Sequence, residues 1–350
     1  MEEKNLNSVE NVNETEQKDY ILEVEGLKQY FPVATNFLGK PLAFLRAVDG
    51  VSFKLERGRT LGVVGESGCG KTTLGRTILR LYDVTDGTAK YTSLNENGEK
   101  VTYDLAKISK KEFYNLRTEL QLVFQDPYSS LPPRMTVGSI IGEAVKVHKI
   151  VPDSEIAAYV RSVMARCGLQ PHHYDRYPHE FSGGQRQRIC IARALAVKPK
   201  LVICDEPVSA LDVSIQAQII NLLKKLQREE GMSYIFISHD LSVVKYISDD
   251  IAVMYLGNIV EMGTAKEICN NAKHPYTQAL FSAVPVANPH NKSEPVALEG
   301  ELPSPANPPM GCKFHTRCKY CTDKCREVAP TMTDIGDGHF VNCHLYSKDN

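Results

Sequence analysis

The sequence contains no tryptophan, and none of its apolar runs approaches the roughly 18 to 20 residues that a membrane-spanning helix requires. The N-terminus also lacks the basic start and apolar core of a secretory signal, so we expect the chain to be made and kept in the cytosol. An excess of one charge is missing too, because 41 basic residues balance 42 acidic ones and leave a net charge of -1. Without a positive field over the whole molecule, we expect no nucleic-acid partner.

The 350 residues are enough for two or three domains. Residues 1–19 have few apolar side chains, which predicts a disordered tail. From residue 20 to 262, β-rich runs alternate with helical stretches, which predicts an α/β domain with a mostly parallel sheet. Within it, residues 113–195 have mainly helical periodicity broken by prolines, as an inserted helical subdomain would. Residues 263–350 are expected to form an extension, with a proline-rich connector at 283–310 and a cysteine-rich end.

A phosphate-binding loop is indicated by the sequence Gly-Glu-Ser-Gly-Cys-Gly-Lys-Thr at residues 65–72, between a predicted strand at 60–64 and a helical run at 74–81. Glycines let backbone N–H groups face phosphate oxygens, and the following helix offers its positive N-terminus. Lys71 would reach the outer phosphates, and the Thr72 hydroxyl would bind Mg²⁺. The residues assigned to the nucleotide are Gly65, Glu66, Ser67, Gly68, Cys69, Gly70, Lys71, Thr72 and Thr73. The pattern therefore predicts a nucleotide-binding domain.

Two carboxylates end a later apolar run, residues 201–204. Asp205 would lie at the carboxyl end of this predicted strand, beside the phosphate loop, where it could hold Mg²⁺. Glu206, the next residue, is the candidate general base that polarises the attacking water. Further β-rich runs are predicted at 51–55, 120–124 and 233–237.

Residues 181–188, Phe-Ser-Gly-Gly-Gln-Arg-Gln-Arg, contain a second glycine pair at a predicted helix start. Ser182 can cap that helix, and Gly183 and Gly184 would let a phosphate approach its N–H groups. The stretch resembles the signature sequence of ATP-binding cassette (ABC) ATPases, and it precedes the Asp-Glu pair as in that family. The resemblance implies the fold of a P-loop ABC-type nucleotide-binding domain and assigns Gln185, with the three residues before it, to the nucleotide.

The resemblance also implies roles for residues outside these motifs. Gln125 resembles the glutamine that senses the Mg²⁺ site, residues 209–212 resemble the D-loop, and His239 resembles the switch histidine that contacts the γ-phosphate. Phe31 resembles the aromatic side chain that stacks on adenine, with Tyr30 as the alternative.

The branch of the family is indicated by four stretches, residues 47–53, 124–131, 177–182 and 274–280, which resemble oligopeptide/dipeptide importers. The resemblance runs from about residue 20 to 346. Phe181 and residues 207–212 resemble the second of that branch's two ATPase subunits. Pro132 departs from the pattern, because the family more often has Asn there.

The resemblance implies that two ATPase chains dimerise head to tail and enclose each ATP between one phosphate loop and the other chain's signature. The expected partners are a related ATPase, two permease subunits and an extracytoplasmic peptide-binding protein, with this chain on the cytoplasmic face of the membrane. Residues 125–135 and 177–180 are expected to face the permeases. Open alternatives are another cargo such as nickel, a soluble non-transport ABC ATPase that acts on nucleic acid or ribosomes, and an electron-transfer module with a regulatory ATPase.

Five of the ten cysteines lie within 32 residues near the end of the chain: Cys312, Cys318, Cys321, Cys325 and Cys343. In a cytosolic chain this clustering favours metal binding over disulfides, and the spacing suits either Zn²⁺ or an iron–sulfur cluster. Residues 311–318, 325–327 and 343–345 resemble the C-terminal motif that holds a 4Fe-4S cluster in some peptide importers. The resemblance places the four ligands at Cys312, Cys318, Cys325 and Cys343, and it leaves Cys321 as an extra thiol.

Overall fold

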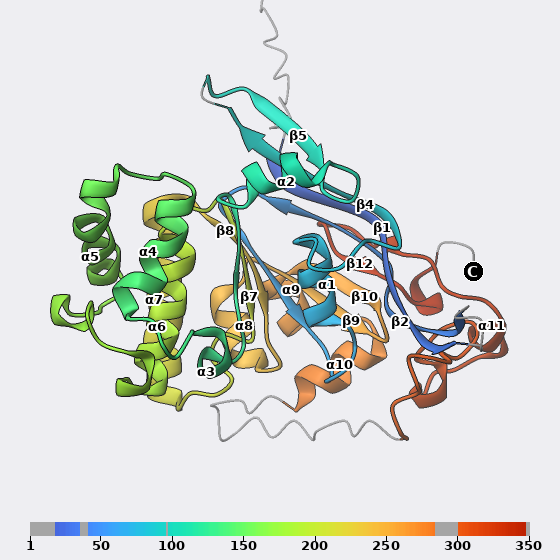
Figure 1. The fold of residues 1–350 in the computed structure, drawn as a ribbon. Helices are drawn as coiled ribbons and strands as arrows, with labels where there is room; N and C mark the ends of the chain where they lie inside the picture. The colour runs from blue at the N-terminus through green and yellow to red at the C-terminus, as the bar shows by residue number, and fades with distance from the viewer. Residues whose placement is uncertain (1–17, 36–40, 96, 284–299, 348–350) are drawn as a thin grey trace, which may run out of the picture.

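The structure, a computed structural model, describes residues 18–35, 41–95, 97–283 and 300–347. Within these ranges the strands form two sheets, and the larger has the order β11-β12-β10-β9-β3-β8-β7-β6 (Figure 1). Its strands are β3 (Thr60–Val64), β6 (Leu120–Val123), β7 (Leu201–Asp205), β8 (Ser233–Ile237), β9 (Asp250–Tyr255), β10 (Asn258–Thr264), β11 (Thr333–Asp334) and β12 (Phe340–Val341). The pairs among β6, β7, β8, β3 and β9 are parallel, as the sequence predicts, and the pairs among β9, β10, β12 and β11 are antiparallel.

The smaller sheet is antiparallel and has the order β2-β1-β4-β5. Its strands are β1 (Tyr20–Thr35), β2 (Pro41–Glu56), β4 (Asp86–Leu94) and β5 (Lys100–Asp104). The alternation between strands and helices does not predict this second sheet. Two residues of the expected tail are ordered beside it, because Lys18 pairs with Glu56 at 2.7 Å and Asp19 pairs with Arg57 at 2.9 Å. The rest of the expected tail lies outside the described residues.

Both faces of the central strands are buried, which explains their continuous apolar sequences. Leu61 and Val63 of β3 point into a core shared with α1 (Lys71–Ile78) and the smaller sheet. Val64, the next residue, belongs to the opposite core, which contains α6 (Gly183–Leu195) and α7 (Val213–Glu230). The larger sheet is therefore the middle layer of the molecule.

The remaining helices lie between strands along the chain. Helix α2 (Lys110–Leu116) precedes β6, and α8 (Leu241–Ile247) connects β8 to β9. Between β6 and β7 lie α3 (Pro127–Ser130), α4 (Val137–Val147), α5 (Ile156–Arg166) and α6. Figure 1 shows α4, α5 and α6 together at one end of the molecule, while α11 (Asp323–Glu327) lies at the opposite end.

The segment after β10 is attached to the larger sheet. Helices α9 (Ala265–Asn270) and α10 (Pro275–Ser282) follow β10 directly. Further along, β12 pairs with β10, with Val341 opposite Glu261. The carbonyl of Pro305 accepts a hydrogen bond from the Arg46 N–H at 3.2 Å, which fixes the described part of the expected connector against β2. Residues 284–299 of that connector lie outside the described residues.

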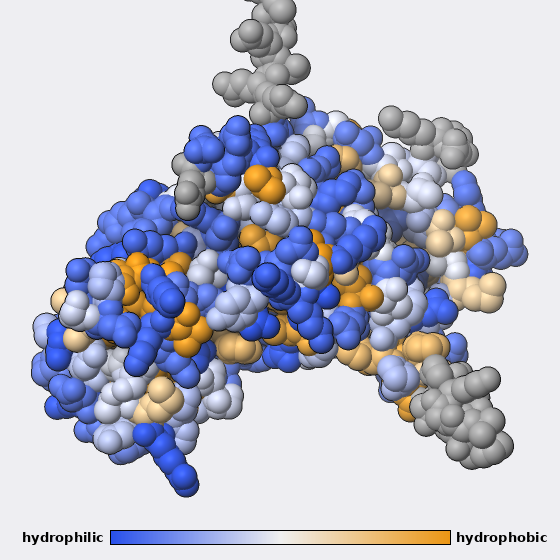
Figure 2. Space-filling model, turned by 45° about the horizontal axis from the view of Figure 1, so that its top comes forward, coloured by the Kyte–Doolittle hydropathy of each residue, from blue (hydrophilic) through white to orange (hydrophobic). Residues whose placement is uncertain are grey.

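The face drawn in Figure 2 is largely hydrophilic, and its hydrophobic side chains form small patches with no continuous apolar band. Among the described helices, none is long and apolar enough to cross a membrane.

Candidate active site

The carboxyl ends of four neighbouring parallel strands form the candidate site. The strand order β3-β8-β7-β6 brings the residues that follow these strands to one edge of the sheet. The phosphate loop follows β3, His239 follows β8, Glu206 follows β7 and Gln125 follows β6. Topology therefore gathers residues that are up to 174 positions apart in the sequence.

The phosphate loop connects β3 to α1 and needs glycine at both ends. Gly65 has φ +149° and Gly70 has φ +107°, in the region that side-chain-bearing residues rarely adopt. A Cβ atom at Gly65 would collide with the carbonyl oxygen of Met254, and one at Gly70 with that of Ala47. The loop therefore packs against β9 and β2 without room for side chains at these positions.

Lys71 begins α1 and folds back into the loop. Its Nζ atom donates hydrogen bonds to the carbonyl oxygens of Gly65 at 2.8 Å and Glu66 at 3.0 Å. The residue is only 6% exposed, so its charge is held inside the loop's curve. An ammonium group in this position can neutralise the outer phosphates of a bound nucleotide.

Thr72 and Asp205, the two residues predicted to bind Mg²⁺, are in direct contact. The Thr72 hydroxyl donates to Oδ1 of Asp205 at 2.7 Å, and the Arg76 guanidinium lies 3.6 Å from Oδ2. Burial raises the pKa of Asp205, while the Thr72 hydrogen bond and the Arg76 charge oppose that shift. Oδ2 is buried and has no hydrogen-bond partner among the described residues. A hydroxyl next to a carboxylate with an unsatisfied oxygen is a donor set that fits Mg²⁺.

The three predicted catalytic side chains are in contact, with Gln125 and His239 both next to the Glu206 carboxylate. Its Oε2 atom accepts a hydrogen bond from Gln125 Nε2 at 2.9 Å and lies 3.2 Å from His239 Nδ1. The Glu206 backbone has φ +47°, an unusual conformation for a residue with a side chain, and its N–H donates to the Ile237 carbonyl at 2.9 Å. Backbone strain of this kind concentrates at functional sites. The carboxylate is thus fixed beside the Thr72–Asp205 pair.

The signature residues lie elsewhere. Ser182 caps α6 by accepting from the Gln185 N–H at 3.4 Å, and the Gln185 side chain accepts from the Ser182 N–H at 3.1 Å. Gly184 has a packing role, since a Cβ atom there would lie 2.5 Å from Ile215 of α7. Among the described residues, no hydrogen bond or ion pair joins 182–185 to the phosphate loop. Within one chain, the structure does not bring the two glycine motifs together.

Comparisons with known proteins identify the family. The family described as "ABC transporter" matches residues 48–209, and the family "Oligopeptide/dipeptide transporter, C-terminal region" matches residues 260–325. The oligopeptide transport ATP-binding protein AppF of Bacillus subtilis (strain 168) is 50% identical over 333 residues, which cover 94% of this chain and 98% of AppF. The dipeptide transport ATP-binding protein DppF of Escherichia coli (strain K12) is 49% identical, over 94% of this chain and 95% of DppF.

The chain belongs to the ABC transporter ATPase family. Among solved structures, cbiO1 from Clostridium perfringens, part of the ABC transporter complex cbiONQ, matches with a TM-score of 0.59 and 28% identity over 73% of this chain and 92% of cbiO1. These matches confirm the P-loop ABC ATPase fold and ATP hydrolysis that the motifs predict. They also confirm the resemblance to the oligopeptide/dipeptide branch.

The two candidate adenine-stacking residues of this ABC ATPase have different surroundings. The Tyr30 hydroxyl donates to Asp49, and burial together with this contact raises the pKa of Tyr30 to about 12. Phe31 instead packs edge-on against Tyr82, with ring centres 5.1 Å apart. Unlike Tyr30, Phe31 has no hydroxyl group that needs a hydrogen-bond partner. Its assignment to adenine stacking stays a prediction.

Four of the five clustered cysteines line one cavity of about 110 Å³: Cys312, Cys318, Cys325 and Cys343. Cys321 is not among its lining residues. Burial raises the pKa of Cys312 to about 12 and that of Cys343 to about 11, so metal binding here would have to displace protons. Across the described part of the chain, no group of three or more His, Cys, Asp or Glu residues is placed to hold a metal ion. The thiols share a cavity but are not preassembled around a single ion, and the 4Fe-4S cluster stays a prediction.

Sequence reasoning missed residues after β10 that reach the nucleotide site. Arg317 forms a two-point ion pair with Glu66 of the phosphate loop, and the Tyr276 hydroxyl accepts from the Glu66 N–H at 2.8 Å. Lys313 donates to Asp49 of β2 at 2.8 Å. No short sequence motif contains both members of such a pair, since Arg317 follows Glu66 by 251 positions. The only signal in the sequence was Glu66 itself, because an acidic side chain in a loop that binds anions needs a positively charged partner.

Proposed function

We propose that this chain is the ATP-hydrolysing subunit of an importer for oligopeptides or dipeptides. The meeting of Gln125 and His239 at the Glu206 carboxylate, beside Thr72 and Asp205, carries the hydrolytic part of this proposal. The peptide cargo is supported by relatives such as AppF and DppF, which are named as oligopeptide and dipeptide transport proteins. The chain would then lie at the cytoplasmic face of the membrane.

In the proposed reaction, the loop from Gly65 to Thr73 binds the phosphates and Lys71 neutralises the outermost ones. Thr72 and Asp205, with Gln125, would hold Mg²⁺, which when bound supplies positive charge to the β- and γ-phosphate oxygens. Glu206 takes the proton of the attacking water. His239, beside the same carboxylate oxygen, would contact the γ-phosphate.

The signature would complete the site of a second ATPase chain. Ser182, Gly183 and Gly184 form the capped N-terminus of α6, and helix N-termini favour phosphate groups. Because this terminus has no polar contact with its own phosphate loop among the described residues, a second chain is the natural recipient. We propose a related ATPase as that chain, in a head-to-tail heterodimer.

The helical region between β6 and β7 would contact two permease subunits, which receive peptide from an extracytoplasmic binding protein. Its exposed aromatic side chains support this role: Tyr128 of α3 is 60% exposed and Tyr177, before α6, is 41% exposed. Both lie in the segments 125–135 and 177–180 that the resemblance assigns to the permeases. Exposed aromatic residues are typical anchors of protein–protein interfaces.

We also propose that Cys312, Cys318, Cys325 and Cys343 hold a 4Fe-4S cluster that folds the end of the chain. The cavity of about 110 Å³ that these four thiols line supports this proposal. Thiolates are the usual ligands of such clusters. When bound, the cluster would join segments that otherwise have little apolar content.

Reconstitution in vesicles tests the proposed function. The chain is assembled with its related ATPase and permeases, and ATP-driven uptake of a labelled peptide is measured with the binding protein added. We expect peptide uptake coupled to ATP hydrolysis, and much slower hydrolysis by the isolated chain. Uptake of nickel instead of peptide would contradict the cargo. Full hydrolysis by a strictly monomeric preparation would contradict the two-chain site.

A further inference from the structure

One ion pair joins the C-terminal extension, residues 263–350, to the phosphate loop. Arg317 NH1 lies 2.8 Å from Glu66 Oε2, and NH2 lies 3.1 Å from Oε1. The Arg317 side chain is 6% exposed and that of Glu66 is 26% exposed, so the pair is largely withdrawn from water. Two parallel N–H···O bonds between a guanidinium and a carboxylate are the strongest and most directional form of such a pair.

Glu66 is held by contacts within the loop and by two residues that follow β10. Arg317 binds its carboxylate, and the hydroxyl of Tyr276 in α10 accepts from its backbone N–H at 2.8 Å. Within the loop, the Glu66 carbonyl accepts from Lys71 Nζ at 3.0 Å and from the Cys69 N–H at 3.3 Å. Glu66 therefore connects the phosphate-binding lysine to the end of the chain.

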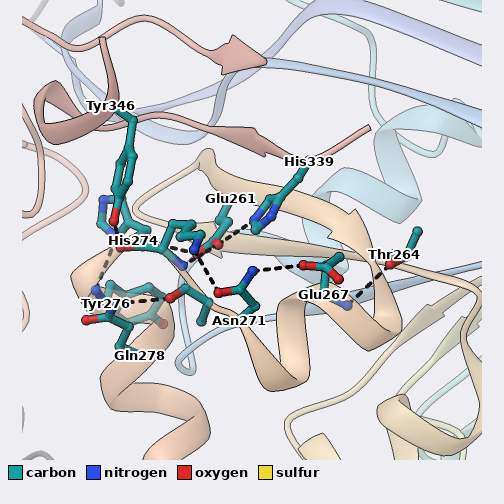
Figure 3. A network of polar contacts seen from close by, with 11 residues as sticks. Glu261, Thr264, Glu267, Asn271, His274, Tyr276, Gln278, His339 and Tyr346 are labelled. Carbon is teal, nitrogen blue, oxygen red and sulfur yellow. Dashed lines mark hydrogen bonds and ion pairs between the residues drawn. The ribbon is translucent and has the colours of Figure 1, made fainter. Parts of the chain in front are cut away.

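Tyr276 is itself fixed by a buried polar network (Figure 3). Its N–H donates to His274 Nδ1 at 3.1 Å, and the His274 N–H donates to Glu261 Oε2 at 2.9 Å. The other Glu261 oxygen lies 2.7 Å from Nε2 of His339, which precedes β12. Since Glu261 is fully buried, these contacts leave its carboxylate little freedom. Two residues of the segment 300–347 thus reach the same loop: Arg317 directly, and His339 through a chain of contacts that ends at Tyr276.

The negative charge of Glu66 explains why the ion pair with Arg317 is needed. A carboxylate in the second position of a phosphate-binding loop repels the nucleotide's phosphates, and partial burial strengthens that repulsion. Pairing with Arg317 compensates the charge of this carboxylate, while Lys71 Nζ contacts carbonyl oxygens of the same loop. We propose that Arg317 is a positioning residue for ATP binding, through which the C-terminal extension sets the affinity of the phosphate loop. This inference rests on the ATP site of the proposed function.

A double-mutant cycle separates this role from general support of the fold. ATP affinity is measured by titration of the purified full-length chain, without added metal, for the unchanged protein, Arg317→Ala, Glu66→Gln and the double variant. We expect Arg317→Ala to weaken binding about five- to tenfold when Glu66 is present, as loss of a partly buried charge partner does. In the Glu66→Gln background, where removal of Arg317 leaves no carboxylate unpaired, the same substitution should weaken binding less than twofold.

Two further variants keep the result interpretable. Arg326→Ala is the matched control, because Arg326 lies in the same extension but is 62% exposed and 4.0 Å from its partner Asp323; its ATP affinity should match the unchanged chain. Arg317→Lys keeps the charge without the two-point contact and should weaken binding two- to threefold, and it replaces Arg317→Ala if that variant does not fold.

The inference is overturned if Arg317→Ala binds ATP as tightly as the unchanged chain, or if its loss is the same in both Glu66 backgrounds. Failure of the unchanged chain to bind ATP would instead contradict the proposed function, so the two failures can be told apart.

Discussion

His239 Nδ1 lies 3.2 Å from Glu206 Oε2, the oxygen that also accepts the Gln125 hydrogen bond. One carboxylate oxygen therefore has two polar neighbours, each from the end of a different strand. A water molecule bound next to Glu206 would compete with Gln125 and His239 for the Oε2 atom. This arrangement makes Glu206 the side chain whose removal should separate chemistry from binding.

Glu206→Gln should reduce ATP hydrolysis by about 100-fold or more, because an amide cannot accept the water's proton. ATP binding should remain, since the phosphate loop is unchanged. Turnover and equilibrium binding are measured on the assembled transporter, with Lys71→Ala as the contrasting variant. Loss of the Lys71 ammonium should weaken binding itself. If Glu206→Gln hydrolysed ATP at the unmodified rate, the general-base assignment would be wrong.

Gly184→Ala should lower the free energy of unfolding by about 1–3 kcal/mol, because the new methyl group would lie 2.5 Å from Ile215 and force α6 away from α7. Gly183→Ala is the matched control: its Cβ atom would lie 3.4 Å from Leu211, an ordinary contact. Denaturant unfolding of both variants measures the difference. Equal destabilisation by the two substitutions would show that packing between α6 and α7 is not the cause.

Cys318→Ser should remove bound iron, whereas Cys321→Ser should not, because Cys318 lines the shared cavity and Cys321 does not. Protein purified without oxygen is expected to be brown, with about four irons and four acid-labile sulfides per chain. Iron, zinc and sulfide are assayed on both variants and on the unchanged chain. Stoichiometric zinc without labile sulfide would rule out the cluster and leave the ATPase untouched.

The sequence predicts the central strands well because both of their faces are buried. Residues 60–64 and 233–237 correspond to β3 and β8, in which every residue is buried and nearly all are apolar. The smaller sheet gives a weaker signal, since β4 mixes buried and exposed positions and the pairing of β1 with β2 is broken by register shifts. Strand β12 has only two residues, too few for any periodicity.

The residues of the candidate site likewise differ in how far the sequence predicts them. Glu206 and His239 could be placed in advance because each directly follows, or nearly follows, a predicted parallel strand, and such ends meet at one edge. Arg317 and Tyr276 could not, because they lie outside the alternating strands and helices and make side-chain contacts over more than 200 positions. Contacts of that kind depend on the tertiary fold and leave no local pattern.

The long separation between Glu66 and Arg317 also bears on how the protein is synthesised. On the ribosome, the phosphate loop and β10 emerge well before residue 317 and β12, so the loop's acidic residue at first has no partner and β10 is an open sheet edge. A nascent chain stalled before residue 340 would expose that edge to strands of neighbouring chains. Premature termination is therefore expected to yield aggregating fragments rather than a smaller working ATPase.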